Sequence, residues 1–131
     1  MFIDAQHIYS DAQAVTSSAA STNVIDHGAA GDAGVPLKVY VTVDTAFTTS
    51  TSATLTVSLY TDSVEAISSP TTLITSQTFA ASALTEGAVL LNAYIPAGME
   101  QYTEIYYTVG TGTFTAGKVN AQLVFDAPSN L

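Results

Sequence analysis

The side chains best suited to binding a metal ion lie in and beside one glycine-rich segment, residues 27–36. The sequence contains two histidines, His7 and His27, and His27 stands between Asp26 and Asp32. Zinc sites usually have three or four His, Cys or carboxylate ligands, whereas this segment supplies one histidine and two aspartates. The alternating Asp or Asn spacing of a calcium loop, closed by a downstream Glu, is absent. We therefore expect no metal or other cofactor, and expect the two aspartates to organise turns by hydrogen bonding to the backbone.

The residues that could support hydrolysis do not form a catalytic motif. Serines are numerous, but none lies in a Gly-x-Ser-x-Gly sequence. Glu100 and Glu104 could act as a carboxylate pair only if their segment were helical, and Tyr102–Val109 is predicted to be a strand. Residues 110–117 are rich in glycine but lack the Gly-Lys-Ser/Thr ending of a phosphate-binding loop. The sequence therefore predicts a protein without enzymatic activity.

Tyrosines are concentrated near the C-terminal third of the chain, at Tyr94, Tyr102, Tyr106 and Tyr107. Three interpretations remain open for them. They could pack at the edge of a core with their hydroxyls in water, contribute to a protein interface, or stack against a sugar. The absence of tryptophan counts against the sugar platform. Phe114 is expected to anchor the tip of a flexible hairpin connection.

These side chains must be positioned by β-strands, because apolar and polar residues alternate in three segments. Apolar residues occupy every second position of Leu37–Asp44 and Lys118–Phe125, and of Ala53–Asp62 as far as Leu59, which indicates half-buried strands. The predicted strands are Thr22–Asp26, Leu37–Asp44, Ala53–Asp62, Leu73–Phe79, Val89–Ile95, Tyr102–Val109 and Lys118–Phe125. The expected core contains Val39, Val41, Leu55, Val57, Leu59, Leu91, Leu123 and Phe125. Short strands separated by Gly-, Ser-, Thr- and Pro-rich turns favour an all-β fold, an antiparallel β-sandwich of the jelly-roll type.

The N-terminal residues differ from the rest of the chain, because their apolar residues do not alternate. We expect residues 1–20 to form an extended N-terminal arm and residues 21–131 to form the single sandwich domain. The arm carries apolar anchors at Phe2, Ile3, Ile8 and Tyr9. Ser10–Gln13 matches a capping box that would start a helix over Asp11–Ser17, but an extended chain fits equally well. Removing residues 1–12 is expected to leave a folded domain that has lost its contacts with other subunits.

The charge balance excludes several classes of partner. The chain has eleven acidic residues, two lysines and no arginine, which gives a net charge of −9. Nucleic acids and anionic membrane surfaces are bound through Lys and Arg, so we expect neither as a partner. The acidic surface either is simply solvated or steers the protein toward a basic partner. No apolar segment is long enough to span a membrane, and Asp4 interrupts the N-terminus, so no signal peptide is expected.

Hydroxyl side chains dominate the polar positions of the strands. Threonine (20 residues) and serine (13 residues) make up a quarter of the sequence. Exposed strands usually carry charged side chains that prevent pairing between sheet edges. Short hydroxyls leave the sheet surface flat and largely uncharged, which suits a surface that another protein covers.

Two stretches of the chain carry a resemblance to a known family. One begins Met1-Phe-Ile-Asp-Ala-Gln, continues as Ser10-Asp-Ala-Gln-Ala-Val-Thr16 and runs through Ala20-Ser-Thr-Asn-Val-Ile-Asp26. The other is Ile105-Tyr-Tyr-Thr-Val109 followed by Gly112-Thr-Phe-Thr-Ala-Gly-Lys-Val119. Together with the strands between them, they resemble the capsid cement (decoration) proteins of tailed phages of the Bordetella-podophage type. The resemblance implies a jelly-roll subunit that oligomerises on the mature capsid and clamps neighbouring major capsid proteins. The chain departs from the family in being unusually acidic and free of arginine.

The resemblance sets the functional expectation. It implies a structural virion protein on the outer capsid surface, made in the host cytoplasm, whose partners are the major capsid protein and a second copy of itself. A dimer is expected in preference to a trimer. The alternative is a carbohydrate-binding virion or cell-surface module. The candidate interface residues are Phe2, Ile3, Ile8, Tyr9, Tyr102, Tyr106 and Phe114.

Overall fold

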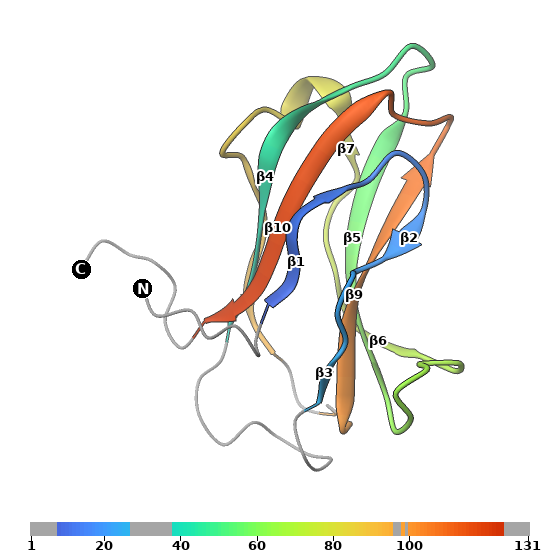
Figure 1. The fold of residues 1–131 in the computed structure, drawn as a ribbon, viewed down its shortest axis with the longest axis vertical. Helices are drawn as coiled ribbons and strands as arrows, with labels where there is room; N and C mark the ends of the chain where they lie inside the picture. Colours follow the sequence, from blue (N-terminus) through green and yellow to red (C-terminus); the bar gives the residue numbers. More distant parts are fainter. Residues whose placement is uncertain (1–7, 27–37, 96–97, 99, 125–131) are drawn as a thin grey trace, which may run out of the picture.

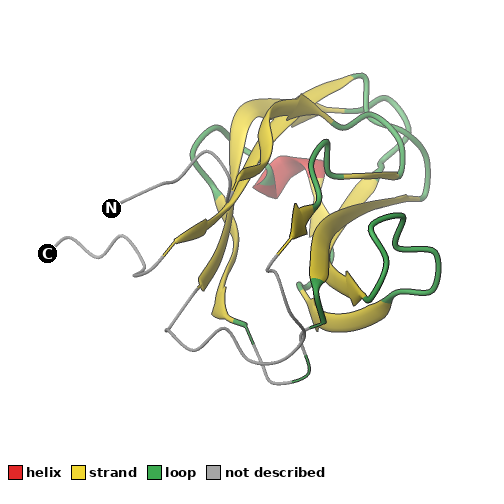
Figure 2. Ribbon diagram, turned by 60° about the horizontal axis from the view of Figure 1, so that its bottom comes forward, coloured by secondary structure: helices red, strands yellow, loops and turns green. Residues whose placement is uncertain are grey.

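Two antiparallel sheets pack face to face in the computed structural model, which describes residues 8–26, 38–95, 98 and 100–124 (Figure 1, Figure 2). The strands are β1 (Ile8–Ala14), β2 (Ala19–Ala20), β3 (Ile25–Asp26), β4 (Lys38–Thr48), β5 (Thr54–Asp62), β6 (Thr71–Thr75), β7 (Phe79–Ala80), β8 (Val89–Tyr94), β9 (Tyr102–Gly110) and β10 (Ala116–Val124). A single 3₁₀ turn, η2 (Ala81–Ala83), is the helical element among the described residues. The predicted all-β sandwich is confirmed.

The strand order is that of a jelly roll. Sheet A has the order β1-β10-β4-β8, and sheet B has the order β2-β9-β5-β6, with β3 also paired to β9 and β7 to β5. When β2 with β3 and β6 with β7 each count as one strand, the first strand pairs with the last, the second with the second-to-last, and so on inward. These pairs fall alternately in sheets A and B. Such an arrangement is a long antiparallel hairpin rolled into two sheets, the architecture of the jelly roll.

The core lies between the sheets and is built from the alternating residues of the long strands. Along β4 the inward residues Val39, Val41 and Val43 are buried, and the residues between them are half-exposed. This alternation follows from the two-residue period of a strand. The predicted core residues are buried at Val39, Val41, Leu55, Val57, Leu59, Leu91 and Leu123, whereas Phe125 lies outside the described residues.

The described part of the expected arm is a strand of the sandwich. Residues from Ile8 onward form β1, which pairs with β10 and is the edge strand of sheet A, so the helical alternative is wrong (Figure 1). Tyr9 is fully buried, and its hydroxyl lies 2.6 Å from Oγ1 of Thr103 on β9 in the opposite sheet. Ser10 Oγ donates to Gln13 Oε1 and lies 2.8 Å from the Tyr107 hydroxyl, also on β9. The segment therefore connects the two sheets instead of extending away from them.

Two predicted strands are shorter or divided. The prediction Leu73–Phe79 corresponds to β6 and β7, which are separated where Ser76 leaves the regular ladder. Ser76 N–H donates to the Val57 carbonyl, and Ser76 Oγ accepts from Val57 N–H at 3.0 Å, so its side chain replaces a backbone partner. The prediction Thr22–Asp26 is reduced to β3, because Thr22 N–H donates to Gln13 Oε1 and Asn23 N–H to the Tyr9 carbonyl instead of to β9.

A close aromatic contact fixes the connection between β9 and β10. The rings of Phe47 and Phe114 meet edge to face with centroids 4.8 Å apart, and both side chains are buried. Gly117 lies against the Phe47 ring at a φ of +148°, and a Cβ atom at this position would overlap the ring. The packing therefore requires glycine here.

Replacing Gly117 with alanine should destabilise the fold by about 3 kcal/mol, from overpacking and backbone strain together. Gly87 is the matched control, because it also has a positive φ (+86°) but no atom lies within 4 Å of the place that an added Cβ would occupy. Gly87→Ala should cost only about 1 kcal/mol. Chemical denaturation of both variants measures the difference. Equal losses would show that the Phe47 ring shifts freely and does not constrain Gly117.

Candidate interaction surfaces

The described residues hold no cluster suited to metal binding. No three His, Cys, Asp or Glu side chains gather within the described ranges. His7, His27 and Asp32 lie outside those ranges, so the glycine-rich segment stays a prediction. Asp26 is at the end of β3 and accepts a hydrogen bond from Gln101 Nε2 at 3.1 Å. The described helical residues include no segment long and apolar enough to cross a membrane.

The seven candidate interface residues separate into three groups. Phe2 and Ile3 lie outside the described residues. Tyr9 and Phe114 are buried in the core, at 0% and 3% exposure, and cannot present a contact surface in this fold. Ile8, Tyr102 and Tyr106 are half-buried. Ile8 belongs to sheet A, whereas the two tyrosines belong to β9 in sheet B.

The outer face of sheet B carries three tyrosines. On β9, Tyr102 and Tyr106 point away from the core, because the alternate residues of the strand are buried. Tyr60 on β5 joins them, and its ring stacks on that of Tyr106 with centroids 5.4 Å apart and an interplanar angle of 15°. Tyr60 was absent from the sequence candidates, although it shares the outward parity of Thr54 and Thr56 in the predicted strand. That parity was the signal that could have found it.

Hydroxyl groups surround these rings. The Thr56 and Thr78 hydroxyls lie 3.0 Å apart, and those of Ser58 and Thr75 lie 3.4 Å apart. Ser58 faces outward but is only 6% exposed. These short side chains bond to each other across the strands and carry no charge.

Glu104 lies at the end of this face that also carries acidic residues of the neighbouring strands, Asp62 on β5 and Asp26 on β3, each in register with Tyr102. It lies between Tyr102 and Tyr106 on β9 and directly opposite Tyr60 on β5. Partial burial raises the pKa of the Glu104 carboxyl, since the charged form loses hydration. Within the described ranges its carboxylate has no hydrogen bond or ion pair that would offset this loss.

Replacing Glu104 with glutamine should therefore stabilise the isolated protein at neutral pH. A carboxyl whose folded-state pKa is raised contributes stability below its unfolded pKa, and that contribution is lost as pH rises through the folded pKa. We expect the Tm of Glu104→Gln to exceed that of the wild type by about 2 °C at pH 7, a size typical of surface changes. The two Tm values should converge below about pH 4, where the carboxyl is protonated in both states.

The control for this prediction is Glu65→Gln. Glu65 is exposed, and its replacement changes the net charge by the same amount. Scanning calorimetry across pH measures both variants. An unchanged or lower Tm for Glu104→Gln at pH 7 would show that the carboxylate has a stabilising partner.

Asp62 has the opposite electrostatic environment. It accepts hydrogen bonds from Ser69 N–H at 2.9 Å and Ser63 N–H at 2.6 Å. These bonds, led by the one from Ser69, lower the pKa of the Asp62 carboxyl, because they favour its charged form. Asp62 therefore organises the loop after β5 and is not available as a free carboxylate.

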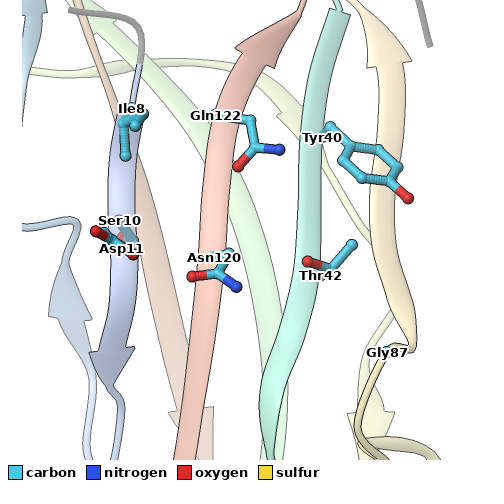
Figure 3. Close-up of a pocket in the computed structure, with 8 residues that line it drawn as sticks. All are labelled: Ile8, Ser10, Asp11, Tyr40, Thr42, Gly87, Asn120 and Gln122. Atoms are coloured by element: carbon cyan, nitrogen blue, oxygen red, sulfur yellow. The ribbon is translucent and has the colours of Figure 1, made fainter. Parts of the chain in front are cut away.

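The outer face of sheet A holds an open depression of about 500 Å³ (Figure 3). The lining side chains come mainly from β1, β10 and β4, with one glycine before β8, and comprise Ile8, Ser10, Asp11, Tyr40, Thr42, Gly87, Asn120 and Gln122. Ile8, Gln122 and Tyr40 stand in register on neighbouring strands. Asn120 is already engaged, since its Oδ1 accepts from Ala12 N–H and its Nδ2 donates to Asp44. The depression thus combines one aromatic ring with amide, hydroxyl and carboxylate groups.

Both lysines of the chain lie in sheet A. Lys38 on β4 places its Nζ 4.5 Å from the centre of the Tyr94 ring, a cation–π contact with β8. Lys118 on β10 is exposed. Since the chain has no arginine, the strands of sheet B carry acidic residues and no Lys or Arg.

The fold and these surfaces define an acidic jelly-roll protein with a tyrosine- and hydroxyl-rich outer face. The sequence matches the model of the Bbp16 family over residues 9–123, and the chain belongs to that family. The match covers every described strand, with the first residue of β1 and the last of β10 just beyond it. No curated protein matches the sequence.

Proposed function

We propose that the chain is a capsid cement (decoration) protein on the outer surface of a phage capsid, where it bridges and stabilises major capsid protein subunits. The observation that carries the proposal is the outer face of sheet B, which is rich in hydroxyls and carries a stacked pair of tyrosines. Tyrosine is enriched at protein interfaces and often dominates their energetics. The Bbp16 family name points to a phage protein and supports this context.

In this proposal the protein acts by binding to capsid subunits and catalyses no reaction. An interface of about 800 Å² per partner is typical of specific complexes. After the costs of association, such a contact contributes several kcal/mol per copy. Many copies on one shell would together resist the outward pressure of packaged DNA.

Self-association is part of the proposal, and a dimer is favoured over a trimer. Strand β8 is an edge of sheet A, and within the described residues it pairs only with β4. Val89 and Tyr94 on this strand are exposed at 48% and 56%, two of the large apolar side chains that remain open to solvent. An open edge with apolar side chains is suited to pairing with a second copy across a twofold axis. With only two lysines, neither nucleic acid nor membrane is a proposed partner.

The test measures the resistance of capsids to rupture. Capsids assembled with and without the protein are heated or exposed to osmotic shock, and the fraction that releases DNA is measured. We expect decorated capsids to rupture at a higher temperature, and the purified protein to restore that threshold when added to bare shells. Because the protein is acidic, the association rate should fall as salt rises, while the buried contacts persist. Equal rupture thresholds, or failure to bind bare shells, would rule out the cement function.

The depression on sheet A favours a second candidate, carbohydrate binding. Tyr40 and Gln122 stand in register on neighbouring strands, and Asp11 lines the same depression from β1, so the depression offers the combination of apolar and polar contacts that sugars require (Figure 3). A glycan array followed by NMR titration of any hit would test it. If a glycan shifts the NMR signals of Tyr40 and Gln122 and the protein does not bind capsid shells, carbohydrate binding is favoured over the cement function.

A further inference from the structure

The outer face of sheet B holds a group of side chains with the composition of a cation-binding site. We name Tyr60, Tyr102, Glu104 and Tyr106 the tyrosine–glutamate cluster. Glu104 pairs directly with Tyr60 across the strands, and the other two tyrosines flank it two residues away on the same face of β9. Directly opposed side chains have Cβ atoms about 5 Å apart, and flanking ones remain within reach of aromatic rings. A group bound at the carboxylate would therefore touch aromatic surface on several sides.

The carboxylate in this cluster lacks a partner within the described residues. Its surroundings remove part of its hydration and return no hydrogen bond or ion pair. An uncompensated charge of this kind costs stability, and a bound cation would remove the cost. The stacked pair of Tyr60 and Tyr106 also fixes one wall of the site before any partner arrives.

The chain supplies few cations that could fill the site. It has no arginine, and both lysines belong to sheet A. In a second copy, Lys38 is held over the Tyr94 ring, so Lys118 is the lysine that remains open to solvent. The missing cation is therefore best supplied by a different protein.

An arginine fits the chemistry of the cluster better than a lysine. Its guanidinium is planar, bonds a carboxylate through two parallel N–H groups and stacks on aromatic rings, whereas an ammonium group is a strongly hydrated point charge. We propose that the tyrosine–glutamate cluster docks an arginine side chain of a partner protein, with the guanidinium bonded to Glu104 and stacked on the tyrosines. This inference rests on the proposed function, since it makes the partner a shell subunit that presents arginine.

The first experiment tests the site without any shell. The full-length ¹⁵N-labelled protein is titrated by NMR with Nα-acetylarginine methylamide at low salt, and in parallel with its lysine and citrulline counterparts. We expect weak, saturable shifts for the arginine probe, with Kd of order 10 mM, centred on residues 58–62 and 102–106. Citrulline has the same shape without the charge and should bind at least about tenfold more weakly, as should the arginine probe on Glu104→Gln.

Glu65→Gln is the control and should bind the arginine probe as the wild type does, because the exposed Glu65 lies outside the cluster. The following outcomes would overturn the assignment. Shifts that are absent, spread evenly over the acidic surface, or equally reduced in both variants would show that no specific site exists. If the lysine probe binds as tightly as the arginine probe, the cluster does not select arginine. Any cationic side chain, such as Lys118 of a second copy, could then occupy it.

The second experiment separates this inference from the cement function. Binding of the wild type, Glu104→Gln and Glu65→Gln to bare shells is compared at equal ionic strength. We expect Glu104→Gln to bind about tenfold more weakly and Glu65→Gln to bind within about twofold of the wild type. If all three bind equally, the cement function stands and the docking site is wrong. If the wild type itself does not bind, the cement function fails, and the arginine titration alone decides the site.

Discussion

Replacing Val41 with aspartate should prevent the protein from folding. Val41 is fully buried in β4, the strand of sheet A that pairs with both β10 and β8. An aspartate there would place an unpaired charge between the sheets, and its cost of at least about 4 kcal/mol is a large share of the stability of a typical domain. We expect the variant to be insoluble, or to lose the cooperative thermal transition seen by circular dichroism.

A second aspartate in the same strand provides the control. Thr45 is exposed on β4, and Thr45→Asp introduces the same carboxylate on the solvent side. Its cost should be below about 1 kcal/mol, because the position is exposed and lies directly opposite Lys118 on β10. A soluble Val41→Asp variant with an unchanged Tm would mean that the inward face of β4 is assigned wrongly.

Deleting residues 1–12 should also unfold the protein, contrary to the expectation from sequence that this segment is a dispensable arm. The deletion removes most of β1, which uncovers the edge of β10 and removes the buried Tyr9 side chain. Loss of a large buried aromatic residue alone typically costs about 3–5 kcal/mol. Ser10, which bonds to the Tyr107 hydroxyl in the core, is lost as well, so a buried polar group is left without this partner.

Point substitutions at Tyr9 separate the two contributions. Tyr9→Phe keeps the packing and removes the hydroxyl near Thr103, and should cost about 1–2 kcal/mol. Tyr9→Ala should cost about 4 kcal/mol. Urea denaturation of both, with expression trials of the truncated chain, measures these effects. A truncated chain that folds with a near-wild-type Tm would restore the interpretation of this segment as a contact arm.

The arginine-docking inference implies that the tyrosine–glutamate cluster lowers the stability of the isolated protein and raises its affinity for the partner. Partial burial raises the pKa of Glu104, so its ionised form is expected to lower the stability of the isolated protein, and a guanidinium would offset this loss only in the complex. The same substitution, Glu104→Gln, is then expected to raise Tm and weaken shell binding. Opposite changes of this kind are common where a surface is kept for function instead of stability.

The fold class could be predicted because its signal is local. The two-residue period predicts which face of a strand is buried, whichever strand it pairs with. It does so for Val39, Val41 and Val43, and again for Leu55, Val57 and Leu59. The outward parity of Tyr102 and Tyr106 follows from the same period once Tyr102–Gly110 is a strand. The low content of basic residues, and hence the charge of the surface, is likewise a property of composition alone.

The role of the first described strand was decided only by tertiary contacts. β1 has irregular register on both sides of Ser10, and Ala12 adopts a positive φ of +51°, so its residues show no simple alternation. Tyr9 is held by Thr103, 94 residues away, which no local pattern encodes. The pairing of Tyr60 with Glu104 likewise depends on the register of β5 against β9. A strand's period fixes the face on which a side chain lies, whereas its neighbours are fixed by which distant strand lies beside it and in what register, and only the folded chain determines both.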